Sequence, residues 1–133
     1  MTLFAYGTLL VPRIWRGVVG REFPNQPATL PGFAIYRVEG ADFPGIIPSE
    51  GASIVPGRLF TGLDAEALAR LDAYEDDFYE RRDVTLLDRQ GNPVESQAYV
   101  VADAFRGQLS EETWTLKWFE AEAMADYVRR HGF

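Results

Sequence analysis

The sequence predicts an α+β fold, in which short strands and a few helices build a mostly antiparallel or mixed sheet able to curl into a barrel. Two observations lead to this fold class. About five to seven segments have the pattern of short strands, and about three have helical spacing. The two kinds of segment do not alternate as βαβ units, which disfavours a doubly wound parallel sheet. The length of 133 residues predicts a single domain over residues 1–133.

Composition and charge limit the classes of function. Hydrophobic residues make up 47% of the chain and charged residues 25%, as in an ordinary globular protein with a core. The formal net charge at pH 7 is -7. We therefore expect no nucleic-acid partner and no binding to an anionic membrane surface, since both repel an acidic protein. An anionic small molecule would need local hydrogen-bond donors that overcome this field.

The chain has no cysteine and one histidine, His131. Thiolate nucleophiles, Ser–His–Asp triads and zinc sites built on histidine or cysteine are therefore disfavoured. His131 follows Arg129 and Arg130 and suits the last turn of a helix, where positive charge is favourable. The acidic residues do not match a calcium-binding loop, and we expect no metal site. Any chemistry must use carboxylates, phenols, hydroxyls and backbone groups.

The N-terminal stretch from Met1 to Tyr6 contains no Lys or Arg and no extended apolar run. We expect neither a signal peptide nor a helix that spans a membrane. The expected location is cytoplasmic.

The first elements predict a place where an anion could bind. Thr2–Tyr6 has the pattern of a short strand, Gly7 begins a tight loop, and residues 11–19 predict a short helix with Pro12 in its first turn. This arrangement leaves backbone N–H groups free at the start of the helix. The alternative is an ordinary strand-to-helix turn. The stretch is also locally positive, through Arg13, Arg16 and Arg21.

The rest of the chain supplies the remaining elements. Further strands are expected over residues 28–30 and 33–38, joined by a turn at Pro31-Gly32, and over residues 53–61, 83–88 and 94–101. The last two would form a hairpin, and the strand over residues 53–61 would have a break at Pro56-Gly57. Residues 43–48 contain prolines and predict an edge strand or an extended loop. Ser110 is expected to cap a C-terminal helix. The core-facing stripe of that helix would be Trp114, Trp118, Ala121, Ala125 and Val128.

The helix expected over residues 64–75 carries a functional signal. Asp64 is a good N-cap, and the apolar face runs through Leu68 and Leu71. At roughly 100° per residue, Glu75 lies about 20° from Leu68 and about 40° from Leu71, on the face that should be buried. Burial would raise the pKa of this carboxyl, and neighbouring aspartates would add to the shift, as general acid–base catalysis near neutral pH requires. The alternative is that the helix ends just before Glu75 and leaves it in a solvated acidic turn.

Several short motifs along the chain resemble landmarks of the gamma-glutamylcyclotransferase-like family. In order, they are Tyr6-Gly7-Thr8-Leu9, Pro27–Phe33, Phe43–Gly45, Val55–Phe60 and Leu71–Arg81. In the last motif a Leu-Asp pair precedes a glutamate and a Tyr-x-Arg follows it. Some members have glycine directly after the glutamate, where this chain has Asp76. The match covers roughly residues 2–101.

The resemblance implies a small closed or nearly closed barrel flanked by helices, with a cavity between the first loop and the glutamate. It implies an enzyme, a γ-glutamyl cyclotransferase. In this reaction the free α-amine of a γ-glutamyl group attacks its own γ-carbonyl, and 5-oxoproline and an amine or amino acid are released. Because the nucleophile belongs to the substrate, the resemblance implies no metal and no other cofactor.

The resemblance also assigns roles to residues. Glu75 would be the general base and then the general acid. The backbone N–H groups of Gly7, Thr8 and Leu9 would hold the substrate α-carboxylate. Tyr6 would line the pocket, and Tyr79 would form a hydrogen bond within it.

Two hypotheses about function remain open from the sequence. The first is an enzyme that acts on a small γ-glutamyl compound, whose leaving group would meet the outer pocket at residues 43–47 and 76–78. The second is a non-catalytic small-molecule binding or interaction domain on the same fold. The chain is expected to be a monomer or a weak homodimer.

Overall fold

The structure is a computed structural model that describes residues 1–133. Its seven strands are β1 (Leu3–Ala5), β2 (Asn25–Pro31), β3 (Phe33–Arg37), β4 (Pro44–Pro48), β5 (Ile54–Phe60), β6 (Tyr79–Leu87) and β7 (Pro93–Val101). The α-helices are α1 (Pro12–Val19), α2 (Ala65–Glu75), α3 (Leu116–Glu122) and α4 (Met124–His131). Short 3-10 turns occupy Thr8–Leu10, Asp76–Phe78 and Asp103–Gln108. None of the helices combines the length and the apolar character needed to cross a membrane.

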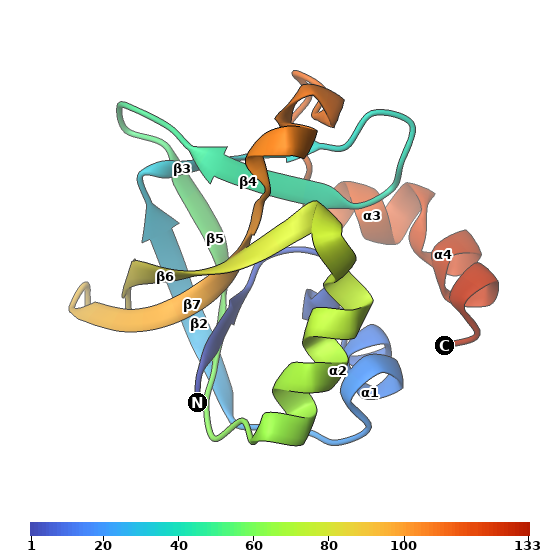
Figure 1. Cartoon of the computed structure of the whole chain (residues 1–133), viewed down its shortest axis with the longest axis horizontal. Helices are drawn as coiled ribbons and strands as arrows, with labels where there is room; N and C mark the ends of the chain where they lie inside the picture. Colours follow the sequence, from blue (N-terminus) through green and yellow to red (C-terminus); the bar gives the residue numbers. More distant parts are fainter.

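Five strands form a closed barrel in the order β1-β5-β2-β6-β7, and β3 and β4 form a separate antiparallel pair. The barrel closes through a parallel contact between β1 and β7, where Phe4 lies opposite Ala98. Its other pairings are antiparallel. In Figure 1, α1 and α2 lie beside the barrel, and α3 and α4 form a separate pair at the C-terminal end. The predicted α+β barrel with flanking helices is confirmed.

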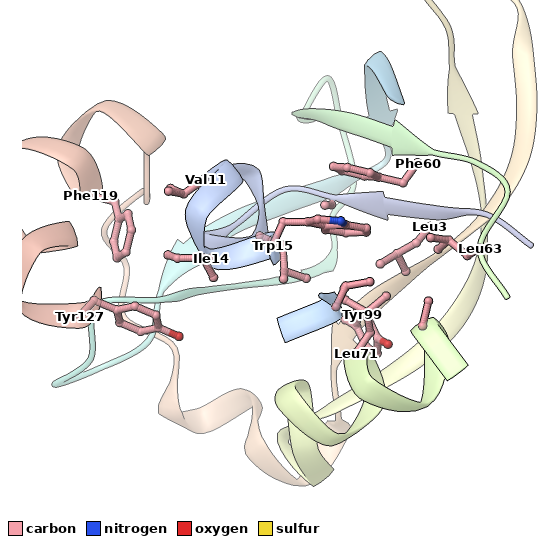
Figure 2. Packing of buried hydrophobic residues seen from close by; sticks show 14 of the residues in the cluster. Leu3, Val11, Ile14, Trp15, Phe60, Leu63, Leu71, Tyr99, Phe119 and Tyr127 are labelled. Carbon is pink, nitrogen blue, oxygen red and sulfur yellow. The ribbon is translucent and has the colours of Figure 1, made fainter. Parts of the chain in front are cut away.

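The chain has two apolar clusters because both faces of β1 are buried. Phe4 and Tyr6 belong to the cluster that also contains Ile46 and Val100. Leu3 and Ala5 point to the opposite side, as the two-residue period of a strand requires, and join the cluster under the helices. That second cluster includes the labelled residues of Figure 2. Burial on both faces fixes β1, and with it the loop that follows at Tyr6.

Trp15 anchors α1 to the barrel. Its indole ring stacks on Phe60 of β5, with ring centroids 3.9 Å apart and planes 10° from parallel (Figure 2). The indole N–H donates to the carbonyl of Arg21 at 3.0 Å. A buried aromatic ring with its polar atom satisfied gives the helix one defined position.

The predicted break at Pro56-Gly57 is wrong, because β5 pairs with β2 without interruption from Ile54 to Phe60. The glycine serves close packing instead. A Cβ on Gly57 would lie 2.3 Å from the carbonyl oxygen of Ala5. Strand β6 also begins at Tyr79 rather than at residue 83, because its first residues pair with the end of β7.

The single C-terminal helix predicted from Ser110 is wrong. The Ser110 hydroxyl donates to the carbonyl of Arg37 at 2.8 Å, and the helix begins only after Thr115, whose Oγ1 accepts from the N–H of Trp118. At Ala123 the chain leaves the helical region, with φ of -132°, and a second helix follows. The break changes the buried set. Trp114 and Val128 are buried as predicted, but Ala121 and Ala125 are exposed, Trp118 is only partly buried, and Phe119, Ala123 and Tyr127 are the other core residues.

Candidate active site

A cavity of about 330 Å³ lies at one end of β1, between the first loop, the end of α2, the start of β4 and helix α4. Sixteen residues line it, ten of them hydrophobic. Every site residue predicted from the sequence is among them, namely Tyr6, Gly7, Thr8, Leu9, Glu75 and Tyr79. The fold therefore brings together two motifs that are far apart in the sequence.

Glu75 is the last residue of α2, and it is partly buried. The helix starts as predicted, since Asp64 Oδ1 accepts from the N–H of Ala67 at 2.9 Å. Leu68 and Leu71 are buried on the same face. The alternative of a solvated Glu75 is wrong. The acidic residues that follow it, Asp76 and Asp77, are exposed.

Burial raises the pKa of Glu75 from its ordinary value of 4.5 to about 8. No hydrogen bond and no nearby cation offsets this effect. The expected contribution of the neighbouring aspartates is absent, because Asp72 pairs with Arg81 and Asp76 and Asp77 face solvent. A carboxyl with a pKa of about 8 can both accept and return a proton near neutral pH.

Asp76 ends the helix in an unusual backbone conformation. Its φ is 60° and its ψ is -167°, a region that is essentially restricted to glycine. Its N–H donates to the carbonyl of Asp72, and its Oδ1 accepts from the N–H of Asp77 at 2.8 Å. Such a conformation costs on the order of 1–3 kcal/mol. This explains why glycine would suit this position, directly after Glu75.

The loop Tyr6–Leu9 continues into a 3-10 turn that faces the cavity. The first hydrogen bond of the turn is donated by the N–H of Leu10 to the carbonyl of Gly7 at 3.0 Å. The N–H groups of Thr8 and Leu9 therefore have no acceptor within the turn. Gly7 packs closely against β4, since a Cβ there would lie 2.9 Å from Pro44 Cγ.

The three arginines of the locally positive stretch do not reach the cavity. Arg13 donates to the carbonyl of Phe133 at 3.0 Å, while Arg16 pairs with Glu22 and Arg21 pairs with Asp64. No Lys or Arg lines the cavity. No arginine or lysine side chain is therefore available to an anion in this cavity.

Tyr6 and Tyr79 fix the walls of the cavity through their hydroxyls. Tyr6 donates to the carbonyl of Tyr99 at 2.5 Å, and Tyr79 donates to the carbonyl of Pro44 at 2.5 Å. Burial raises the pKa of both phenols, with Glu75 as a further cause, so both keep their protons. Tyr79 thus hydrogen-bonds to a residue of the cavity wall.

Sequence reasoning missed the residues that α4 brings to the cavity, Tyr127 and His131. The His131 ring lies on the Tyr127 ring with centroids 4.1 Å apart. His131 does occupy the last turn of its helix, as predicted, but it also lines the cavity. The i,i+4 spacing of the two residues, which places them on one helix face, was the available signal.

Comparison with known proteins identifies the family of this chain. The sequence model of the family described as "Gamma-glutamyl cyclotransferase, AIG2-like" matches residues 3–118. The AIG2-like protein D of Arabidopsis thaliana is 32% identical over 103 residues, which are 76% of this chain and 67% of that protein. The AIG2-like protein A of the same plant is 37% identical over 79 residues. That alignment covers 59% of this chain and about half of the relative, 47% of its length.

Solved structures show the same fold. A solution structure of an Arabidopsis thaliana protein matches with a TM-score of 0.73 at 26% identity, over 97% of this chain and 86% of the other. A protein named gamma-glutamyl cyclotransferase matches with a TM-score of 0.58 at 19% identity, over 76% of this chain and 66% of the other. Because the family model matches most of the chain, this chain belongs to the gamma-glutamyl cyclotransferase, AIG2-like family.

Proposed function

We propose that this protein is a γ-glutamyl cyclotransferase in which Glu75 transfers the proton. The observation that carries the proposal is the partly buried carboxyl of Glu75, whose pKa is raised to about 8, in a cavity that is also lined by Thr8 and Leu9, whose N–H groups have no acceptor within the turn. Membership of the family and the fold of a named cyclotransferase support the reaction class.

The reaction moves two protons from the α-nitrogen to the leaving nitrogen. Ionised Glu75 takes the first proton from the substrate α-ammonium, and the resulting amine attacks the γ-carbonyl carbon to form the new C–N bond. Glu75 gives this proton to the leaving nitrogen as the original amide C–N bond breaks. The second proton leaves the α-nitrogen once it is bonded to the carbonyl carbon, and ionised Glu75 passes it to the departing amine in the same way. The products are 5-oxoproline and an amine or amino acid released in its ammonium form, and Glu75 is ionised again. Proton transfer of this kind is typically worth about 10²–10⁴-fold in rate.

The cavity walls would supply the attack geometry. In this proposal the backbone N–H groups of Gly7, Thr8 and Leu9 hold the α-carboxylate, and the two phenols of Tyr6 and Tyr79 keep the walls in place. Because the α-amine and the γ-carbonyl belong to one substrate molecule, holding its γ-glutamyl group in a folded conformation can supply a large effective molarity for the attack. Because no Lys or Arg lines the cavity, neutral N–H and O–H groups would be the main partners of the α-carboxylate.

The test is to incubate the purified protein with a panel of γ-glutamyl amines and γ-glutamyl amino acids and to measure 5-oxoproline by mass spectrometry. We expect Glu75→Gln to lose about 10²–10⁴-fold in rate. Asp77→Asn, which changes an exposed neighbouring acid, is the matched control and should keep the wild-type rate. Equal product from Glu75→Gln and wild type would exclude this mechanism. A γ-glutamyl ligand that binds and is never turned over would favour the non-catalytic binding domain.

A further inference from the structure

Three hydroxyl groups form a continuous chain along one wall of the cavity. Thr8 Oγ1 and the Tyr74 hydroxyl are 2.8 Å apart, and the Tyr74 hydroxyl is also hydrogen-bonded to the Tyr127 hydroxyl. All three residues line the cavity. They come from the first loop, from the residue before Glu75 and from α4. The chain therefore connects the C-terminal helix with both motifs of the proposed site.

The number of protons in this chain leaves one donor free. Three hydroxyls carry three protons, and the two hydrogen bonds within the chain use two of them. Burial raises the pKa of Tyr74 and of Tyr127, so both phenols stay protonated at neutral pH. The third proton must point out of the chain, at Thr8, at Tyr127, or at Tyr74 if that hydroxyl accepts both hydrogen bonds.

An anion near the first loop would select the Thr8 end. The side chain of Thr8 is next to its own N–H and that of Leu9, the two donors without an acceptor in the turn. If Thr8 donates to an anion there, Tyr74 must donate to Thr8, and Tyr127 must donate to Tyr74. Each bond then polarises the next in the same direction, which strengthens the terminal donor.

Helix α4 is held firmly enough to take part in such an arrangement. Tyr127 is buried and packs edge-on against Phe119, with centroids 5.4 Å apart. Arg130 pairs with Asp126 on its own helix and with Asp42 in the loop before β4, at 2.8 and 2.6 Å. Helix α4 lies beyond residue 118, where the match to the family model ends.

We infer that Tyr127 is a positioning residue of the cavity, which acts through Tyr74 to direct the Thr8 hydroxyl proton toward the α-carboxylate of a γ-glutamyl ligand. This inference rests on the proposed function for the identity of the ligand. It adds a neutral O–H donor to the backbone N–H groups of the first loop, and it makes the C-terminal helix part of the ligand site.

The experiment measures ligand affinity in the Glu75→Gln background, so that no turnover disturbs the equilibrium. The probe is γ-glutamyl methylamide, and its comparison compound is 4-aminobutyric acid methylamide, which lacks only the α-carboxylate. We expect Tyr127→Phe to weaken binding of the first probe about three- to tenfold, which is the range for one neutral hydrogen bond. The effect should disappear when Thr8→Val is already present, and it should be absent for the probe without the carboxylate.

Controls separate this role from a structural one. Tyr36→Phe removes a partly exposed tyrosine hydroxyl outside the cavity and should leave both affinities unchanged. Tyr74→Phe breaks the same chain at its middle and replaces Tyr127→Phe as the test variant if that protein does not fold. A loss of affinity that persists in the Thr8→Val protein, or that is equal for the two probes, would overturn the inference, as would no loss at all. Failure of Glu75→Gln to bind γ-glutamyl methylamide would count against the proposed function itself.

Discussion

The guanidinium of Arg81 binds both carboxylate oxygens of Asp72, with Nε to Oδ1 at 3.0 Å and Nη2 to Oδ2 at 3.1 Å. Asp72 lies one helical turn before Glu75, whereas Arg81 belongs to β6. The Tyr99 hydroxyl of β7 donates to the same carboxylate at 2.7 Å. These contacts hold the last turn of α2 against the barrel, and so they set the position of the Glu75 carboxyl in the cavity.

Arg81→Lys should therefore lower both stability and turnover. Lysine keeps the charge but cannot bind two oxygens side by side. We expect a loss of about 1 kcal/mol in the free energy of unfolding, since the pair is partly exposed. Urea unfolding and the 5-oxoproline assay measure the two effects. Arg70→Lys, in an exposed i,i+4 pair on the same helix, should change stability by less than about 0.5 kcal/mol. Identical behaviour of the two variants would contradict this account.

The raised pKa of Glu75 predicts a pH-dependent penalty on stability. Between its ordinary value of 4.5 and about 8, the native protein keeps a proton that the unfolded chain has lost. Stability must then fall as pH rises through this window, and the slope from this group is about 1 kcal/mol per pH unit. Glu75→Gln has no such proton. Its stability relative to wild type should therefore rise from pH 5 to pH 8, whatever its value at pH 5.

Urea unfolding of both proteins across this range isolates Glu75, because every other titrating group is common to the two. Asp77→Asn serves as the control and should follow the wild-type curve closely, since Asp77 is exposed. A constant difference between Glu75→Gln and wild type would mean that the carboxyl is ionised throughout, and the proposed acid–base role would lose its support.

Local pattern was sufficient where a single element decided the structure. The cap at Asp64 and the apolar spacing of Leu68 and Leu71 correctly placed Glu75 on the buried face of α2. The Tyr6–Leu9 loop was likewise found next to the cavity, as its motif implied. In both cases the signal lies within a few residues. The helical period was enough to place Glu75, and the short motif around Gly7 was enough to place the loop.

Pattern failed where long-range contacts decided the structure. Ser110 looks like a helix cap, but its hydroxyl and N–H both bond to the carbonyl of Arg37, and the helix starts later. The break at Ala123 turns Tyr127 toward Tyr74, and although the i,i+4 spacing of Tyr127 and His131 places the two on one helix face, it does not show what that face contacts. Pro56-Gly57 looks like a strand break, whereas the closeness of β1 makes glycine necessary there. Each miss involves a partner that is distant in the sequence.

The backbone of Asp76 predicts an unusual order of stability among substitutions. Glycine adopts φ of 60° without strain, so Asp76→Gly should gain up to about 1 kcal/mol, despite the entropy it adds to the unfolded chain. Asp76→Val should lose about 1–3 kcal/mol, because a β-branched residue is poorly tolerated at positive φ. Asp77→Gly, at a position without positive φ, should lose about 0.5–1 kcal/mol. Urea unfolding ranks the three variants. Equal destabilisation by Asp76→Gly and Asp77→Gly would show that the backbone of Asp76 is not strained.

The contact between Gly7 and Pro44 predicts that the first loop cannot accept even a methyl group. A Cβ at Gly7 would lie 2.9 Å from Pro44 Cγ and 3.1 Å from Pro44 Cδ, and a proline ring has little freedom to move away. The displacement would also disturb Tyr79, which donates to the carbonyl of Pro44. We expect Gly7→Ala to lose about 1–3 kcal/mol of stability, as overpacking does, and to lower 5-oxoproline formation at least tenfold.

Gly107→Ala is the matched control for this loop variant. A Cβ at Gly107 meets nothing within 4 Å, and its φ is not in the left-handed region. The substitution should leave turnover unchanged and stability equal or higher by up to about 1 kcal/mol, because alanine restricts the unfolded chain. If Gly7→Ala matches Gly107→Ala in both measurements, the loop and β4 move apart at little cost, and the close contact does not shape the cavity. A loss of turnover in Gly7→Ala alone would show that the spacing between the two motifs limits the reaction.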